Sequence, residues 1–141
     1  MSMPPKLARV APWILLAGDL LALLLFVFQG QRDHELVDPN NPALGVLLAG
    51  LPFLPPWIIA AFLLGAYQTD DLVNHPYKFF ARAINAWLVA APLGLVLRAL
   101  VLGRAVIPTL FVIAGLGFGA LFVLGWRVVF IIVYARWQRR S

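Results

Sequence analysis

The sequence predicts an all-α integral membrane protein in which four transmembrane helices form a bundle. Of the 141 residues, 62% are hydrophobic and 12% are charged, and the mean hydropathy is +0.90. A typical soluble domain is about 45–50% apolar and about 25% charged, and a water-soluble chain of this length could not bury so much apolar surface. The apolar residues form four continuous runs, each long enough for the about 20 residues that cross a bilayer as helix. The runs cover about 10–28, 43–67, 80–102 and 106–134, so residues 1–141 are predicted to form a single transmembrane domain.

Lysine and arginine are distributed unevenly between the two ends of these runs. Seven lie on the side of the chain termini, namely Lys6, Arg9, Lys78, Arg82, Arg136, Arg139 and Arg140, and three lie on the other side, namely Arg32, Arg98 and Arg104. Because basic residues favour the cytoplasmic side of a membrane, both termini are predicted to be cytoplasmic. The net charge of +5 then indicates orientation and contact with anionic lipid rather than nucleic-acid binding. Six aromatic residues near the predicted cytoplasmic ends are expected to form an interfacial belt: Trp13, Tyr67, Tyr77, Trp126, Tyr134 and Trp137.

The first run contains one acid in an otherwise apolar stretch, AGDLLALLLFVFQG. Its basic start is typical of a signal peptide, but no small-residue cleavage site follows, so we expect it to remain as a helix. Asp19 lies ten residues from Arg9 and ten from Gln29, which places it near the middle of the membrane. A charged carboxylate there costs at least about 2.5–3.5 kcal/mol, so it must be protonated, paired or in contact with water. Its small neighbours Gly18 and Ala22 predict that this face packs against another helix.

Arg127, in the last run, is the predicted partner of Asp19. It lies nine residues before Arg136, about 13 Å from the cytoplasmic end of its helix, and the first helix brings Asp19 to a similar depth. Arg98 lies sixteen residues beyond Arg82 and therefore near the outer surface. The alternative is that Arg127 extends its side chain to the inner headgroups. We favour the pair, as a structural clamp rather than a proton relay, because it satisfies two costly groups and no third ionisable group is evident at that depth.

The second run contains a proline cluster, LPFLPPW. Pro52, Pro55 and Pro56 each lack a backbone donor, which leaves carbonyls one turn earlier without partners and predicts a kinked or broken helix. Transporters use broken helices to expose carbonyls to cations near the midplane, so the three prolines are also a candidate solute site. The alternative, which we favour, is a bend filled by neighbouring side chains such as Phe53 and Trp57.

Small residues recur at four-residue spacing in the last two runs. The last run has Gly115 and Gly119 as a GxxxG pair, and the third has Ala86, Ala90 and Gly94. Such spacing lets two helix backbones approach closely, so these five residues are candidates for helix packing. Packing within one bundle is the favoured interpretation, and a dedicated dimer face is the alternative.

The sequence offers no pattern for catalysis, cofactor binding or metal binding. Asp33, His34 and Glu35 are consecutive in a loop, where they rarely converge on one metal, and His75 is expected across the membrane. Neither histidine lies mid-span, where a haem or chlorin ligand is usual. The chain has no cysteine, which excludes disulfides, thiolate catalysis and cysteine metal sites. No nucleophile with an adjacent base, phosphate loop or buried carboxylate pair is evident, so we predict no enzyme, no metal and no cofactor.

The motifs GDLLALLLFV, QRDHE and a final GLGFGA followed by GWR together resemble domain-of-unknown-function family 3054. Its members are small bacterial and archaeal proteins with four predicted spans. The resemblance implies a multi-pass protein of the prokaryotic cytoplasmic membrane and directs attention to Asp19, His34 and Arg127. It implies no activity, substrate or cofactor.

Three functional hypotheses follow from these patterns. The first is a non-catalytic membrane protein that self-associates or serves as an accessory or scaffold subunit of a larger membrane complex. The second is a small proton- or cation-linked transporter or channel that uses Asp19 and the broken second helix. The third is a lipid-, quinone- or pigment-binding subunit. In each case the lipid bilayer is the surrounding partner and nucleic acid is not.

Overall fold

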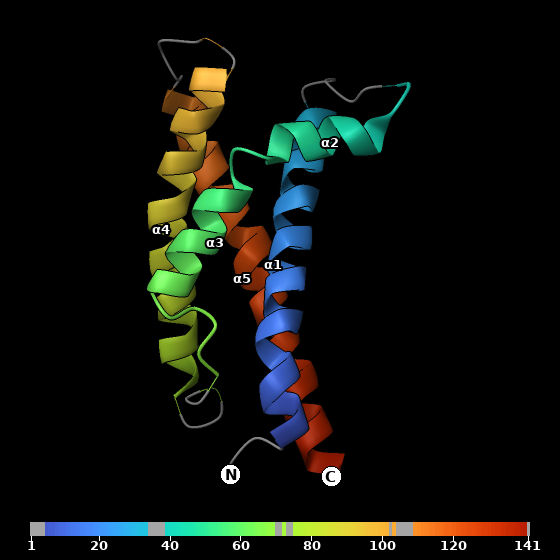
Figure 1. Ribbon diagram of the computed structural model, residues 1–141, viewed down its shortest axis with the longest axis vertical. Coiled ribbons are helices and arrows are strands. Elements are labelled where there is room, and N and C mark those ends of the chain that lie inside the picture. Colours follow the sequence, from blue (N-terminus) through green and yellow to red (C-terminus); the bar gives the residue numbers. More distant parts are fainter. Residues whose placement is uncertain are drawn as a thin grey trace.

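The computed structural model describes residues 5–33, 39–69, 72, 75–101, 103 and 109–140, and within this part of the chain the regular structure is entirely helical (Figure 1). The helices are α1 (Pro5–Asp33), α2 (Pro42–Gly50), α3 (Leu54–Leu63), α4 (Pro76–Val101) and α5 (Thr109–Arg140). Three segments are long and apolar enough to cross a membrane: Arg9–Arg32, Pro76–Val101 and Val112–Trp137. The pair α2 and α3 also passes when taken together, which makes four if it is one span. The apolar helices therefore indicate a multi-pass membrane protein.

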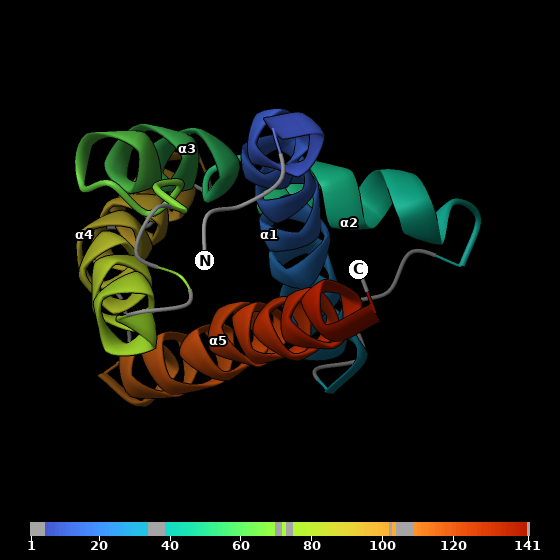
Figure 2. The same cartoon turned by 90° about the horizontal axis from the view of Figure 1, so that it is seen from below.

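The long helices α1, α4 and α5 run along the length of the molecule, and the short helices attach to two of them. Helix α5 packs against both α1 and α4, α3 packs along α4, and α2 packs against α1. Helix α5 runs from beside the upper end of α4 to the lower end of α1 (Figure 1), and in the view from below α3 and α2 lie on different sides of α1 (Figure 2). The start of α1 and the end of α5 lie at the same end of the molecule (Figure 1).

The second apolar run forms two helices with a bend of 48° between them. Pro52 lies in the break at residues 51–53, where the bend was predicted. Pro55 and Pro56 lie in the first turn of α3, where no N–H has an intrahelical acceptor, so they remove no helical hydrogen bond. The expectation that all three prolines deprive helix carbonyls of donors was therefore wrong for Pro55 and Pro56.

Helix α3 ends at Leu63, four residues before the predicted end of this run. Gly65 has φ +75°, a left-handed conformation that side chains with a Cβ rarely adopt. The N–H of Ala66 donates to the Ala61 carbonyl at 2.8 Å, and the N–H of Gly65 donates to the Phe62 carbonyl at 3.3 Å. These two bonds form a Schellman motif, which terminates the helix.

Two clusters of buried side chains occupy the interior on either side of the middle of α1. The upper cluster contains Leu23, Trp57, Ala60, Ala61, Ala66, Ala86, Trp87, Ala90, Ala91 and Val123. The lower cluster contains Ala11, Leu15, Leu72, Phe79, Phe130 and Tyr134. Both clusters contain a pair of aromatic rings in contact: the rings of Trp57 and Trp87 are 6.3 Å apart, and Phe130 stacks on Tyr134 at 6.2 Å. Residues from α1, α3, α4 and α5 meet in these clusters, so the centre of the molecule is filled.

The predicted aromatic belt is only partly present. Trp13, Tyr77 and Trp137 are 71%, 65% and 51% exposed, as a belt requires. Tyr134 is only 5% exposed and belongs to the lower cluster. Tyr67 and Trp126 pack against buried clusters as well. Three of the six aromatics therefore stabilise the interior rather than the membrane interface.

The small residues pack as predicted at some positions and not at others. Ala86, Ala90 and Gly94 are buried in α4, and the ring of Phe53 occupies the space that a Cβ on Gly94 would need. Gly119 is buried and the indole of a tryptophan from α4 covers it, whereas a Cβ on Gly115 would meet nothing within 4 Å. The GxxxG pair thus contributes one close contact inside the molecule rather than a continuous face.

Candidate functional site

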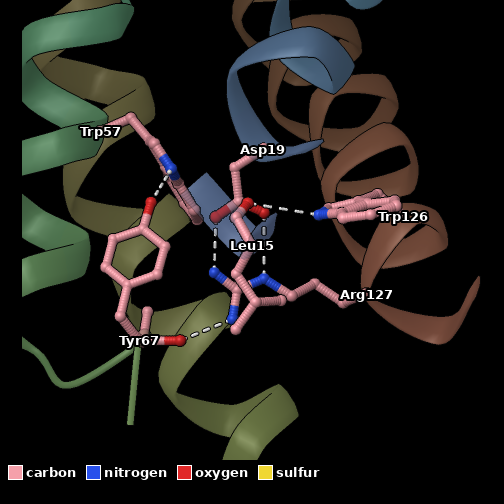
Figure 3. A network of polar contacts seen from close by, with 7 residues as sticks. Leu15, Asp19, Trp57, Tyr67, Trp126 and Arg127 are labelled. Atoms are coloured by element: carbon pink, nitrogen blue, oxygen red, sulfur yellow. Dashed lines mark hydrogen bonds and ion pairs between the residues drawn. The ribbon is translucent and has the colours of Figure 1, made fainter. Parts of the chain in front are cut away.

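The Asp19 carboxylate of α1 and the Arg127 guanidinium of α5 form a buried ion pair (Figure 3). Arg127 Nη2 donates to Asp19 Oδ2 at 2.6 Å, and Arg127 Nε donates to Asp19 Oδ1 at 3.0 Å. Both side chains are 0% exposed. Two parallel bonds between a guanidinium and a carboxylate are strong and fix the geometry of both groups. The pair therefore joins the first and last helices at one defined register.

A third hydrogen bond ties the same guanidinium to the end of α3. Arg127 Nη1 donates to the Ala66 carbonyl oxygen at 2.6 Å. This carbonyl directly follows the Schellman turn, at the C-terminal end of α3, where the helix dipole favours a positive charge. The guanidinium carbon also lies 5.4 Å from the ring centre of Tyr67 and 4.9 Å from that of Phe79. Both distances are within the range of cation–π contact.

Two tryptophans stabilise the elements around the ion pair. Trp57 Nε1 of α3 donates to the Tyr67 hydroxyl at 3.0 Å, which holds the segment after α3 against that helix. Trp126 Nε1 of α5 donates to the Leu15 carbonyl at 3.4 Å (Figure 3). The Trp126 ring lies on Gly18, where a Cβ would overlap it. The packing face predicted from Gly18 is therefore the face on which α5 lies.

The ion pair lies between the two apolar clusters. Leu23 and Trp57 belong to the upper cluster, and Leu15 and Phe79 to the lower one. Among the described residues, Asp19 and Arg127 are the charged side chains buried in the interior. Each oxygen of the carboxylate accepts a hydrogen bond, and the arginine donates from three of its nitrogens. Chemically, this arrangement holds helices together and presents no accessible acid, base or nucleophile.

The structure does not bring the proline cluster to the ion pair. The prolines lie at the break before α3 and in its first turn, whereas Ala66 lies past its last turn. Residues 57–63 of α3, about 10 Å of helix, separate Pro56 from the turn that carries Ala66. Phe53 is 7% exposed and Trp57 is 0% exposed, so side chains fill the bend.

Several residues of the site were not singled out from the sequence. Ala66 contributes a carbonyl oxygen, which every residue has, and Phe79 lies at the start of a different apolar run. Tyr67 was assigned to an interfacial belt instead. A usable signal was Gly65, because glycine shortly after an apolar run is typical of a helix end and exposes carbonyls nearby. His34 and Glu35 lie outside the described residues.

Comparison with known proteins places both members of the ion pair inside one family match. A family model described as "Protein of unknown function (DUF3054)" matches residues 16–130. That range begins just before Asp19 and ends just after Arg127, so it contains both members of the pair. The resemblance inferred from the sequence motifs is therefore confirmed. No curated protein and no solved structure matches the chain.

Proposed function

This chain belongs to the DUF3054 family of proteins of unknown function, and from that premise we propose that it is a non-catalytic scaffold subunit within the membrane. In this proposal it is a four-helix bundle in which α2 and α3 together make one broken span. It associates with copies of itself or with a larger membrane complex. It lies in the cytoplasmic membrane with both termini in the cytoplasm, which is supported by the seven-to-three distribution of basic residues.

The observation that carries the proposal is the closed environment of the ion pair. A transported cation or proton needs a polar route to a charged group inside the membrane. Here Asp19 is 0% exposed and its two oxygens are bonded to Arg127, while apolar clusters lie on both sides. The position that a transported cation would take beside Asp19 is occupied by a guanidinium of the same chain. This supports a clamp that holds helices rather than a site that binds and releases.

The test is to replace both charges together. Asp19→Leu with Arg127→Met replaces both charged side chains by apolar ones, so that neither charge is left buried without its partner. We expect the double variant to fold in the membrane and to keep the oligomers or complexes that the unaltered chain forms after extraction in mild detergent. A scaffold requires the shape that the pair maintains, whereas a transporter requires the charges themselves.

The second measurement is the flux of protons or cations across a vesicle membrane that contains the protein. The purified chain is reconstituted into phospholipid vesicles, and proton or cation movement is followed with a pH-sensitive dye under an imposed gradient. We expect the unaltered chain to give the same flux as vesicles without protein. A specific flux that disappears in Asp19→Asn, with the fold intact, would establish the transporter hypothesis and overturn this proposal.

A further inference from the structure

Asn85 is a polar side chain on the outward face of α4, within the membrane-spanning part. It is exposed in the structure, and none of the hydrogen bonds that join helices in the described part of the chain involves it. It lies nine residues after the start of the span at Pro76 and sixteen before the end at Val101. With the about 30 Å hydrocarbon core centred on this span, the Asn85 backbone lies about 10 Å inside the edge of the hydrocarbon core.

An amide at this depth requires a partner, because hydrocarbon offers no hydrogen bonds and an unpaired amide is costly to bury. The surrounding surface is apolar: Ile84 is 41% exposed and Leu88 is 58% exposed. Ala81, one turn before Asn85 on the same face, is also exposed, and a small residue there lets another helix approach closely. Lipid tails satisfy the apolar neighbours but leave the amide unsatisfied.

The same face of α4 carries a second polar group, a backbone carbonyl, that lacks its usual hydrogen-bond donor. Pro92 lies inside α4 and is exposed, and it has no N–H to give to the carbonyl of Leu88 one turn earlier. A polar side chain and a carbonyl without its helical donor thus lie on one lipid-facing surface. This combination is expected where a polar contact from another helix completes the surface.

We propose that α4 binds α4 of a second copy of this chain through the face formed by Ala81, Asn85 and Leu88. An amide both donates and accepts, so two Asn85 side chains related by a two-fold axis complete each other, and no different partner is needed. Interhelical pairs of this kind fix the register and the oligomeric state of helix dimers. This inference rests on the proposed scaffold function and names one partner for it.

The experiment uses the absence of cysteine from the chain, because any introduced cysteine is then unique. Ala81→Cys and Leu88→Cys are oxidised separately in native membranes, and disulfide-linked products are separated by mass. The control is Leu121→Cys on the lipid-facing side of α5, where the side chain is 66% exposed. Its depth is similar, because the Trp87 indole of α4 donates to the Leu116 carbonyl of α5.

We expect a product of twice the chain mass from at least one α4 position and little from Leu121→Cys. Adding Asn85→Leu should lower the crosslinked fraction about threefold or more, and Asn85→Gln, which keeps the amide, should lower it less. The factor corresponds to the about 0.6 kcal/mol average for an interhelical polar contact in a membrane. Tryptophan fluorescence and gel filtration in detergent show whether Asn85→Leu retains the fold.

Two outcomes would overturn the inference. One is crosslinking at the α4 positions that does not exceed the control or does not respond to Asn85→Leu. The other is a product whose mass shows a different protein, which would remove the second copy but leave the scaffold function standing. The vesicle flux measurement tests the scaffold function independently of either result.

Discussion

Replacing Asp19 by leucine is expected to destabilise the folded chain by about 3–5 kcal/mol, because Arg127 is then buried without its counter-charge. Leucine has the same branching at Cγ as aspartate, so the change removes charge and hydrogen bonding and replaces each carboxylate oxygen by a larger methyl group. The two bonds lost are those from Arg127 Nε and Nη2, at 3.0 and 2.6 Å. The third bond, from Nη1 to the Ala66 carbonyl, remains. One hydrogen bond does not offset the cost of burying a charged guanidinium without its counter-charge.

Arg127→Met alone should cost a similar amount, because it leaves the carboxylate without a partner and the Ala66 carbonyl without its donor. In the double variant no charge remains unpaired, and the main loss is the Ala66 bond. A buried carbonyl left unpaired costs about 1–3 kcal/mol. The double variant should therefore be about 1–3 kcal/mol less stable than the unaltered chain. The coupling between the two positions is then at least about 3 kcal/mol, a large value for one pair of residues.

The assay is the free energy of unfolding measured by titration with sodium dodecyl sulfate from mild-detergent micelles, followed by tryptophan fluorescence. The control is Val128→Met, adjacent to Arg127 on α5 but 44% exposed, which should leave stability within about 0.5 kcal/mol. Additive effects of Asp19→Leu and Arg127→Met would refute the reasoning, because two independent sites add and a coupled pair does not.

The remaining predictions concern packing, backbone conformation, hydrogen bonding and topology. Gly119→Ala should destabilise the chain by about 1–3 kcal/mol, because the new Cβ would overlap an indole ring. Gly115→Ala should be neutral, because nothing lies within 4 Å of the new Cβ. Equal effects of the two substitutions in thermal unfolding would contradict this prediction. Gly65→Ala should cost about 1–2 kcal/mol in the same assay, because φ is +75°, and asparagine at that position should cost less. Trp57→Phe should cost more than the about 0.5–1.5 kcal/mol of its lost hydrogen bond, because the smaller ring also leaves a cavity at a position that is 0% exposed. An unchanged melting temperature would contradict this. A reporter fused after Ser141 should be active on the cytoplasmic side, and a periplasmic signal would reverse the proposed orientation.

The ion pair was predictable from the sequence because membrane burial makes charge rare and costly. In a chain with 12% charged residues, an acid and a base far from the ends of antiparallel helices have few alternatives to each other. A helix rises about 1.5 Å per residue, so the residue numbers predicted that Asp19 and Arg127 lie at similar depths in the membrane. The small residue Gly18 indicated which side of α1 faces another helix.

The other contacts of the Arg127 guanidinium depend on tertiary structure, which the spacing of apolar residues in the sequence does not predict. Nothing in the apolar run 43–67 marks where its helix ends, except Gly65, and a glycine inside a membrane helix is common. The helix end decides which carbonyl faces the guanidinium, so Ala66 followed only from the structure. Phe79 contacts the guanidinium because α4 begins beside it.

The end of α3 explains why a broken span need not be a transport site. In transporters, the C-terminal end of a half-helix and a nearby acid hold a cation that arrives from solution. Here the end of α3 offers the Ala66 carbonyl, α1 offers Asp19, and the cation that fills the position is Arg127. A covalently attached cation cannot leave, so the same electrostatics that bind a solute elsewhere hold three helical elements together in this chain. Where α3 ends, the Schellman turn supplies donors to the carbonyls of Ala61 and Phe62, and Arg127 supplies a donor to the carbonyl of Ala66. Whether the cation is a free solute or a side chain of the protein, and not the break itself, determines whether such a site can release it.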